Sequence, residues 1–486
     1  MGRIVVVGAG VGGLATAARL SALGHEVVVC EQSDALGGKL GVHRRDGFVF
    51  DTGPSLVTMP EALADTFAAT GATLTDALDL VELDPIARYR FADGTRLDVS
   101  RDPVARAASM EASLSPGSSL DWQRFLARAG RIWRATEQPF LRQALSVGEL
   151  ARRLPSLPTI APGRSLSSLG RRYLADPRLR MLLDRYATYQ GSDPRRAPAA
   201  LATVPYAEQA FGAWYVLGGL GRIAEALAAQ ALLLGAELRT GSDVTRVVTA
   251  GGRAIGVELA DGERLPADVV VANADATHLY RDLVDSPRAG RMRRRLARLE
   301  PSLSGFVLLL AVEGATPGIA HHNVLFPTDY EAEFDALFGP HPRPVPDPTL
   351  YAVVPDDPAV APAGHEAWFV LANAPRQGQV DWAQPGLAEG YAEHLLEVLA
   401  RRGLDLSGRL RFTEHRSPLD LARRTRAIGG AIYGTSSNGP SAAFLRPANR
   451  SPVPGLHLVG GSAHPGGGLP LVLRSAEIVA GQVGPA

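Results

Sequence analysis

The stretch RIVVVGAGVGG, residues 3–13, decides the fold, because an apolar strand runs there directly into a glycine-rich turn. The unbroken run IVVV is typical of a strand that is buried on both faces of a parallel sheet. Gly8, Gly10 and Gly13 then give the G-x-G-x-x-G spacing, and apolar residues at helical spacing follow. A second apolar strand is expected at residues 26–30. This order of strand, turn, helix and strand predicts a Rossmann-like unit that binds a dinucleotide.

Each glycine of the turn meets a separate physical requirement. Gly8 permits the tight turn, Gly10 lets the backbone approach a pyrophosphate, and Gly13 lets the helix pack closely on the sheet. Glu31 ends the second strand, near the spacing of about 20 residues at which an acidic residue binds ribose hydroxyls. Its negative charge would repel a 2′-phosphate, which disfavours NADP. A tight structural turn without a ligand is the alternative, and the flanking strands and Glu31 argue against it.

Length and composition limit the class of protein. A chain of 486 residues is too long for one ordinary hydrophobic core, so two domains are expected. The formal net charge is zero, which gives no electrostatic reason to expect a nucleic-acid partner. The single cysteine, Cys30, excludes an intrachain disulfide, and its place in an apolar strand predicts a core role.

Hydropathy bears on localisation. No apolar run approaches the length of about 20 residues that a membrane span requires. The chain enters its first strand at once, which leaves no room for a signal peptide. We therefore expect a cytoplasmic protein, which would still be able to lie against the inner face of the cell membrane.

A second glycine turn follows the second strand. The segment Leu36-Gly37-Gly38-Lys39 would bring backbone N–H groups and a cation over the far side of a pyrophosphate. Lys39 is the only lysine in a chain that otherwise uses arginine, which supports that role. A solvated turn is the alternative, and this stretch alone does not decide between the two.

Residues 121–173 combine many arginines with an apolar helical face. Trp122, Phe125 and Ile132 share one face of the expected helix, while Arg124 and Arg131 lie away from it. A basic, aromatic and amphipathic helix is typical of contact with a membrane interface. A helix of a substrate domain with an arginine-rich solvent face is the alternative, and both interpretations remain open.

The rhythm of helices and apolar strands resumes after a long insertion and again near the C-terminus. The closing segment combines a strand, a glycine-rich loop and a helix. We therefore expect a discontinuous nucleotide-binding domain and an inserted α+β substrate domain. The nucleotide-binding domain would comprise residues 1–75, 225–285 and 410–486, and the substrate domain would comprise residues 76–224 and 286–409.

Several motifs in this order resemble one flavoprotein superfamily, which includes amine oxidases, protoporphyrinogen oxidase and carotenoid desaturases. They are the N-terminal unit with Glu31, the two segments 36–39 and 50–55, and the motifs YATYQGSDP (186–194), WYVLGG (214–219), VANAD (271–275) and VGGSAHPGGGLP (459–470). The chain is most similar to the bacterial-type phytoene desaturases and related carotenoid desaturases. Its last motif departs from their commonest form and looks more like the hydroxycarotenoid 3,4-desaturases.

The resemblance implies FAD in an extended pose, with its adenosine half at the N-terminal unit and its isoalloxazine ring near the C-terminal loop. The implied cofactor residues are Gly8, Gly10, Val11, Gly12, Gly13, Glu31, Gln32, Gly38, Lys39, Gly53, Pro54, Ser55, Val244, Asn273, Gly461, Gly468, Leu469 and Pro470. His464 is the implied catalytic residue, with a structural histidine as the alternative. Tyr186, Tyr189, Phe211 and Trp214 would line a tunnel for the polyene, although aromatic residues at such spacing also form plain core.

The chemistry of the expected substrate agrees with a flavin. A C–H bond beside a polyene is not acidic enough for a carboxylate or a histidine alone to ionise it, so desaturation needs a hydride acceptor. A long isoprenoid, phytoene or a hydroxylated carotene, is the expected substrate, collected from a bilayer because each buried CH₂ is worth about 0.8 kcal/mol. Oxygen or a quinone is the expected electron acceptor, since no second dinucleotide unit is present.

Other chemistries have less support in the sequence. His321 and His322 are adjacent, so on a strand they would point to opposite faces, and no metal site is predicted. Two alternatives remain open. One is an FAD-dependent oxidase of an amine, a porphyrinogen or another small apolar molecule. The other is a non-catalytic protein that binds prenyl lipids on the same fold.

Overall fold

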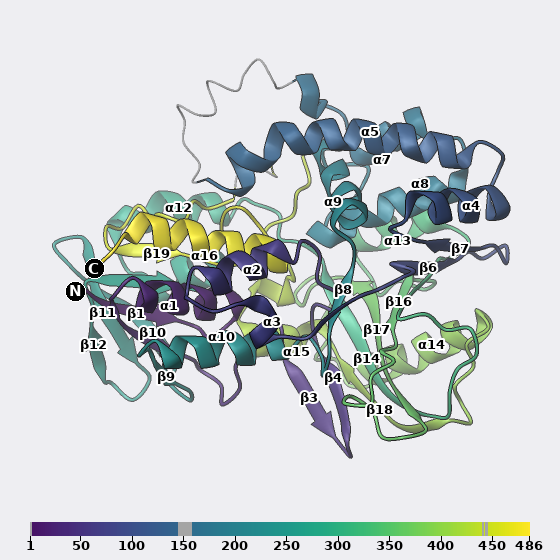
Figure 1. Cartoon of the computed structure of the whole chain (residues 1–486). Coiled ribbons are helices and arrows are strands. Elements are labelled where there is room, and N and C mark those ends of the chain that lie inside the picture. The colour runs from purple at the N-terminus through teal and green to yellow at the C-terminus, as the bar shows by residue number, and fades with distance from the viewer. Residues whose placement is uncertain (1, 144–157, 440–441, 443–445) are drawn as a thin grey trace.

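The computed structural model describes residues 2–143, 158–439, 442 and 446–486 (Figure 1). One sheet holds the predicted dinucleotide unit and consists of β1 (Arg3–Val7), β2 (Glu26–Cys30), β9 (Glu237–Arg239), β13 (Val269–Ala272) and β19 (Leu456–Leu458). The strand order is β19-β13-β1-β2-β9, and all neighbours are parallel. The predicted Rossmann-like fold class is therefore confirmed, with strands drawn from the N-terminal, middle and C-terminal segments.

Different structures cover the two faces of this sheet. Helices α1 (Val11–Ala22), α10 (Arg222–Leu233) and α16 (Leu469–Val483) pack on one face, in a core that contains Ile4 and Val6. The opposite face, with Val5 and Val7, packs in a second core against a three-stranded sheet. Successive residues of β1 thus enter two cores, which explains why its apolar run is unbroken. The three strands are β10 (Val244–Ala250), β11 (Arg253–Leu259) and β12 (Arg264–Pro266).

A seven-stranded mixed sheet forms the second half of the molecule. In spatial order its strands are β18 (Leu410–Arg416), β14 (Ser304–Glu313), β17 (His365–Ala374), β16 (Leu350–Val353), β15 (His322–Leu325), β6 (Ala87–Arg90) and β7 (Arg96–Val99). Helix α14 (Leu387–Arg401) packs against this sheet in a shared core. Strand β18 lies within the segment 410–486 that was expected in the nucleotide-binding domain, and it pairs antiparallel with β14 of this sheet.

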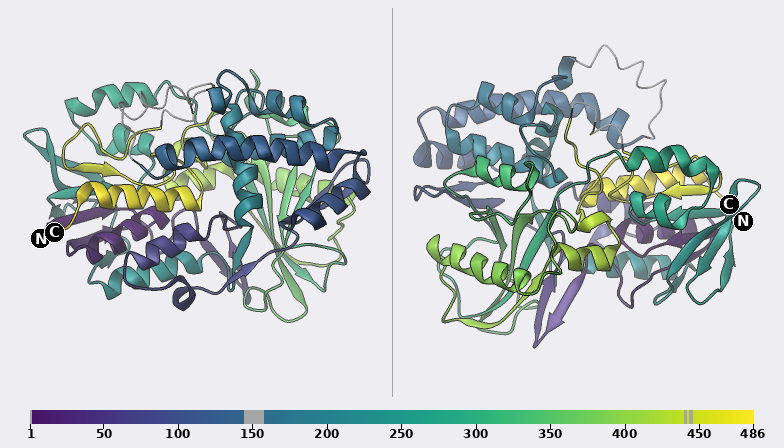
Figure 2. Two further views of the ribbon diagram at one scale, coloured as in Figure 1. Left: turned by 45° about the horizontal axis from the view of Figure 1, so that its top comes forward. Right: turned by 180° about the vertical axis from the view of Figure 1, so that it is seen from behind.

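Helices form a third region, which shares a core with the strands β15, β6 and β7 at one edge of the seven-stranded sheet. They are α4 (Pro103–Ser113), α5 (Ser118–Thr136), η1 (Glu137–Leu141), α7 (Leu166–Tyr173), α8 (Pro177–Arg185), η3 (Tyr186–Gln190), η4 (Ala199–Ala202) and α9 (Thr203–Phe211). Figure 2 shows α5 running along the outside of the molecule.

The predicted amphipathic helix corresponds to α5. Trp122, Phe125 and Ile132 are fully buried, and the indole of Trp122 donates a hydrogen bond to Gln209. Arg124 and Arg131 lie on its exposed face. The apolar face of α5 therefore packs inside the protein, which leaves only its arginine face for any membrane contact. Residues 144–157 of the predicted region 121–173 lie outside the described residues. No helix in the described ranges is both long and apolar enough to cross a membrane.

Short elements connect these regions. They are β3 (Val42–Arg45), β4 (Phe48–Asp51), α2 (Glu61–Ala68), α3 (Leu74–Ala77), β5 (Leu80–Glu82), β8 (Trp214–Val216), α11 (Ala276–His278), η5 (Leu279–Leu283), η6 (Pro287–Ala289), α12 (Gly290–Leu296), α13 (Tyr330–Phe338), α15 (Pro418–Thr425) and η7 (Ile428–Gly430). Both termini lie together at the end of the molecule that carries the parallel sheet (Figures 1 and 2). There the amide of Ala486 donates a hydrogen bond to the carbonyl of Leu23.

Candidate functional site

A cavity of about 1150 Å³ connects the parallel sheet with the seven-stranded sheet and the helical region. Its walls include the turn after β1, the loop before α16, and residues of α8, α9, β14, β16 and β17. Most of the predicted cofactor residues line it, and Gly13 lies behind the wall. Those that line it are Gly8, Gly10, Val11, Gly12, Glu31, Gln32, Gly38, Lys39, Gly53, Pro54, Ser55, Val244, Asn273, Gly461, Gly468, Leu469 and Pro470.

The backbone of the first turn leaves little room for side chains. Gly8 has a φ of +94°, a conformation that L side chains rarely adopt. A Cβ atom on Gly13 would lie 2.1 Å from the carbonyl oxygen of Gly8, and a Cβ atom on Gly10 would lie 2.6 Å from Oδ1 of Asn273. The turn, helix α1 and Asn273 thus form a smooth backbone surface on the cavity wall. Such a surface can approach a phosphate closely.

The Glu31 carboxylate is held at the wall by hydrogen bonds. Its Oε2 accepts from the amide of Ala9 at 2.7 Å, and its Oε1 accepts from the amide and hydroxyl of Ser33 at 3.1 and 3.0 Å. A carboxylate oxygen can accept two hydrogen bonds, and within the described chain Oε2 accepts only the one from Ala9. Glu31 is therefore oriented beside the glycine turn with capacity to accept from a further hydroxyl.

Lys39 fastens the second glycine turn to a distant loop. Its ammonium donates to the carbonyls of Ala431 at 2.9 Å and Ile432 at 2.7 Å, and burial lowers its pKa to about 8. A Cβ atom on Gly53 would lie 1.8 Å from the carbonyl oxygen of Lys39, so segments 36–39 and 53–55 pack together without side chains between them.

Arg424 adds a cation to this wall that the sequence did not single out. Its guanidinium donates to the carbonyl of Gly38 and to the hydroxyl of Thr52, both at 2.8 Å, and burial lowers its pKa. Arg424 lines the cavity beside the second glycine turn. The chain contains many arginines, so the residue type alone carried no signal.

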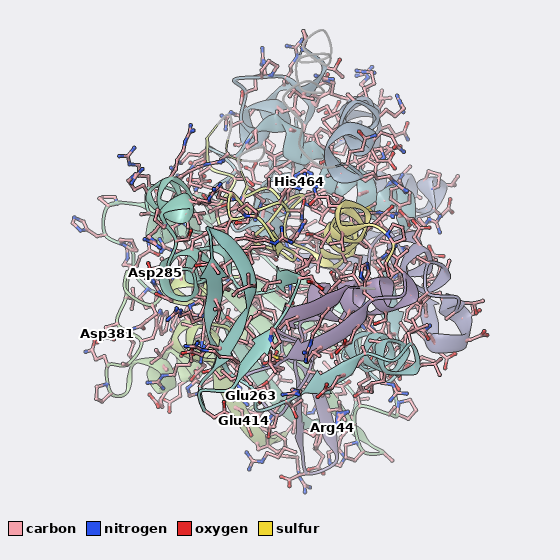
Figure 3. All side chains as sticks on the ribbon, turned by 90° about the vertical axis from the view of Figure 1, so that its left-hand side faces the viewer. Arg44, Glu263, Asp285, Asp381, Glu414 and His464 are labelled. Carbon is pink, nitrogen blue, oxygen red and sulfur yellow. The ribbon has the colours of Figure 1, made fainter. Side chains whose placement is uncertain are left out.

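His464 lies inside the molecule, whereas Asp285 and Asp381 project at its edge (Figure 3). The imidazole lines the cavity, and its Nε2 lies 2.8 Å from the carbonyl oxygen of Gln143. A carbonyl can only accept, so Nε2 carries the hydrogen and Nδ1 keeps its lone pair in the neutral ring. Burial lowers the pKa of His464, which favours this neutral form.

The backbone around His464 is held firmly. Its amide donates to the carbonyl of Pro447 at 2.9 Å, and its carbonyl accepts from Asn449 at 2.8 Å. Arg446 donates to the carbonyl of Gly461 at 2.8 Å, and burial lowers the pKa of this arginine to about 10. The glycine loop before α16 is therefore fixed from both sides.

Of the four predicted tunnel residues, Tyr189 alone lines the cavity within the part of the chain that the structure describes. Tyr186 is fully buried behind it and donates to Glu208 Oε1 at 2.5 Å. Trp214 belongs to β8, and its indole donates to the carbonyl of Phe211 at 2.8 Å. The apolar wall includes Met59, Trp133, Leu201, Val204, Ala207, Val307, Phe369 and Leu371.

His321 and His322 are in contact with each other, which differs from the expectation that they point to opposite faces of a strand. Their ring centroids lie 4.6 Å apart, because β15 begins only at His322. Nδ1 of His322 is hydrogen-bonded to the hydroxyl of Tyr351 at 2.9 Å. Within the described ranges, no group of three or more His, Cys, Asp or Glu side chains is arranged to hold a metal ion.

Comparison with known proteins assigns the family. The model of the flavin-containing amine oxidoreductases matches residues 11–484. The chain belongs to this family. It is therefore a flavoprotein oxidoreductase.

Individual relatives show which members of the family this chain resembles. The 4,4'-diapolycopene oxygenase of Methylomonas sp is 36% identical over 98% of this chain and 97% of the relative. The hydroxyneurosporene desaturase of Cereibacter sphaeroides is 35% identical over 98% of this chain and 96% of the relative. An oxidoreductase of Methanosarcina mazei shares the fold, with a TM-score of 0.69 and 19% identity over 98% of this chain and 99% of that chain. The predicted resemblance to the carotenoid desaturase group of flavoproteins is confirmed.

Three polar residues of the cavity wall were missed by sequence reasoning. Arg185, Glu208 and Tyr351 all line the wall, next to Tyr189. The separation of Arg185 and Tyr189 by one helical turn was a usable signal, because such residues face the same way. Glu208 and Tyr351 come from α9 and β16, so no local pattern links them to the first pair.

Proposed function

We propose that this protein is an FAD-dependent desaturase that removes a hydrogen pair from a long isoprenoid, a carotenoid. The observation that carries the proposal is the continuity of the cavity. Its one end is a dinucleotide cradle with Gly10 and Glu31, and its other end is an apolar enclosure with Val307, Phe369 and Leu371. Relatives named as a carotenoid desaturase and a carotenoid oxygenase, each more than 30% identical, support the substrate class.

The cradle fits FAD. Gly8, Gly10 and Gly12 would admit the pyrophosphate, the amides at the start of α1 would face it, and Glu31 would accept from the ribose hydroxyls. Val244 would lie near the adenine, and the loop with Gly461, Gly468, Leu469 and Pro470 would hold the ring system. A bound flavin supplies a two-electron acceptor for hydride, which a side chain cannot provide.

His464 is the residue proposed to take the proton. Removal of a hydrogen pair releases one hydride and one proton, so the site needs a base beside the hydride acceptor. The neutral imidazole offers its Nδ1 lone pair, while the Gln143 carbonyl holds Nε2–H and fixes the orientation of the ring. The apolar walls exclude water and keep the polyene extended.

The alternatives are an oxidase of an amine or porphyrinogen and a non-catalytic prenyl-lipid carrier. An amine oxidase belongs to another branch of the family and lacks support from the relatives described above. A carrier has no need of the glycine cradle, in which Gly10 and Gly13 admit no Cβ atom without a clash. An oxygenase that acts on the end of a carotenoid shares the proposed substrate and cofactor, and product analysis separates it.

The membrane is proposed as the source of the substrate, with the protein bound peripherally to the inner face. A carotenoid is held in the bilayer by the hydrophobic effect, so the enzyme must collect it there. Exposed arginines of α5 would supply attraction to anionic lipid at about 1 kcal/mol per residue. Oxygen or a quinone is proposed as the electron acceptor.

The decisive experiment is an anaerobic absorbance titration of the purified protein with carotenoids in liposomes. We expect a flavin spectrum that is bleached by a carotenoid, heat-released FAD, and a product that has lost a hydrogen pair. A product that has gained oxygen would indicate an oxygenase. Bleaching by amines alone, or a protein that cannot be loaded with flavin, would overturn the proposal.

Membrane binding has its own test. Replacing Arg124, Arg131 and Arg134 with Gln is expected to weaken sedimentation with anionic liposomes, with the largest loss at low salt. Neutral liposomes are the control. Equal binding of the variant and the parent would refute the proposed contact between α5 and the membrane.

A further inference from the structure

The substrate end of the cavity contains two ionisable groups that a pure hydrocarbon does not require. Arg185 and Glu208 both line the cavity, and only 5% and 2% of their surfaces are exposed. Leu201, Val204 and Ala207 line the wall beside them. Burial of ionisable side chains among apolar groups costs free energy unless their hydrogen-bonding atoms have partners.

The two groups are linked through a tyrosine. Arg185 Nη1 donates to the Tyr189 hydroxyl at 2.7 Å, and that hydroxyl donates to Glu208 Oε2 at 3.4 Å. Tyr186, which lies behind the cavity wall, donates a further hydrogen bond to Glu208 Oε1. The guanidinium has five N–H donors, so donors remain for a ligand after the bond to Tyr189 is made. No carboxylate of the described chain lies within 4 Å of the Arg185 guanidinium.

Aromatic rings hold the Arg185 head group in place. Its guanidinium carbon lies 4.9 Å from the ring centroid of Tyr189 and 5.0 Å from that of Tyr351. The Tyr351 hydroxyl is hydrogen-bonded to Ser55 at 2.8 Å and to His322. The charged group is thus fixed at the cavity wall, which is the arrangement expected of a recognition site.

This polar group lies beside the loop that precedes α16. Gln190, the residue after Tyr189, donates to the carbonyl of Gly467 at 3.2 Å. Gln190 also accepts a hydrogen bond from Arg446, and Arg446 donates a second hydrogen bond to the carbonyl of Gly461. The turn that carries Tyr189 is therefore attached directly to the proposed flavin loop.

We propose that Arg185, Tyr189 and Glu208 form a binding site for a hydroxyl group at one end of the substrate. This inference rests on the proposed desaturase function and specifies the preferred substrates as long polyenes that carry an alcohol. A hydroxyl would accept from Arg185 and donate to Glu208, which gives both groups a further hydrogen bond. A hydrocarbon gives neither bond, an ether lacks the hydrogen for Glu208, and a carboxylate would face the Glu208 carboxylate.

The position of the site also limits where the reaction takes place. Because the turn with Tyr189 is attached to the loop with Gly461 and Gly467, an anchored hydroxyl holds its own end of the polyene next to that loop. The bonds that lose hydrogen are therefore those near the hydroxyl-bearing end.

Binding is tested separately from turnover. Trp133 lines the cavity, so a bound polyene should quench its fluorescence. The probes are a fully conjugated polyene with a tertiary alcohol at one end, its methyl ether and the hydrocarbon of equal length, none of which has a hydrogen pair left to lose. In flavin-loaded protein the alcohol is expected to bind about tenfold to a hundredfold more tightly than the hydrocarbon, with the ether close to the hydrocarbon.

Variants decide whether the named residues cause the preference. Arg185→Met should abolish the ratio of alcohol to hydrocarbon affinity while leaving hydrocarbon binding in place. Glu208→Gln and Tyr189→Phe are close to isosteric, so they decide the question even if Arg185→Met does not fold. Arg172→Gln, an exposed residue at the end of α7, is the matched control and should keep the ratio.

Two results would overturn the inference. Equal weakening of alcohol and hydrocarbon in the variants would assign a purely structural role to the three residues. Wild-type protein that binds all three probes equally would remove the hydroxyl site and leave the desaturase proposal intact. Failure to bind or oxidise any polyene would instead overturn the proposed function itself.

Discussion

The two ends of the cavity are built from different atoms. At the cofactor end the wall is mainly backbone, since Gly8, Gly10 and Gly12 expose no side chain and Gly13 lets α1 pack against β1. At the substrate end the wall consists of side chains that come from α8, α9, β14, β16 and β17. A Cβ atom on Gly10, Gly12 or Gly13 would lie within 3 Å of another atom, whereas residues of a side-chain surface can be replaced one at a time. The glycine turn at the proposed cofactor end is therefore sterically constrained, whereas the proposed substrate end can be varied by replacing single side chains.

The largest effect is expected from Gly13→Ala. The new Cβ atom would lie 2.1 Å from the Gly8 carbonyl, in a turn held between β1 and α1. We expect a loss of at least about 3 kcal/mol of stability and loss of flavin, measured by denaturant unfolding and by absorbance per protein. Gly390→Ala is the matched control, because that glycine lies on the exposed side of α14 with open space around it. It should stabilise the protein by about 0.5–1 kcal/mol. Similar results for both variants would refute the steric argument.

His464 lines the cavity, and His464→Gln is expected to lower kcat by about a hundredfold or more with flavin content unchanged. In the parent protein, kcat should fall as pH drops through the His464 pKa, which burial places below 6.5. A protonated ring has no Nδ1 lone pair, so it cannot accept the proton. In the variant, kcat should no longer fall as the pH drops through this range. Unchanged kcat per bound flavin would assign His464 a structural role.

The pH dependence of stability can show whether the Lys39 ammonium is shielded from water in the flavin-free protein. Burial lowers its pKa to about 8 from an ordinary value of 10.5, so the unfolded chain binds more protons between these two pH values. The stability of the parent relative to Lys39→Met should therefore rise with pH across this window, by on the order of 1–3 kcal/mol. Urea unfolding at several pH values measures the difference. A difference that does not change with pH would show that the ammonium is solvated.

The smallest effect is expected from Trp214→Phe. Trp214 lies outside the described lining of the cavity, and the variant loses one hydrogen bond to the Phe211 carbonyl. We expect a loss of about 1 kcal/mol in stability and no change in polyene affinity by fluorescence quenching. A weaker polyene affinity in the variant would indicate that Trp214 contacts the substrate, and it would contradict the placement of this residue outside the cavity wall.

The residues of the proposed cofactor end could be predicted because they lie close together in the sequence. The spacing of Gly8, Gly10 and Gly13 records a steric requirement within one turn, and Glu31 follows on the next strand of the same unit. The substrate end carried no comparable signal. Arg185 is one of many arginines, and its partner Glu208 lies on another helix. The aromatic residues singled out in its place include Tyr186, which is buried behind the wall.

The sequence by itself determined the parallel sheet, the glycine turn, the resemblance to carotenoid desaturases and the amphipathic pattern of α5. Each of these depends on residues close together in the chain, where spacing follows directly from strand and helix geometry. Only the tertiary structure decided that β18 joins the second sheet, that α5 buries its apolar face, and that Arg185, Tyr189 and Glu208 meet. These depend on the pairing of segments far apart in sequence, and such pairing is set by the packing of the whole chain.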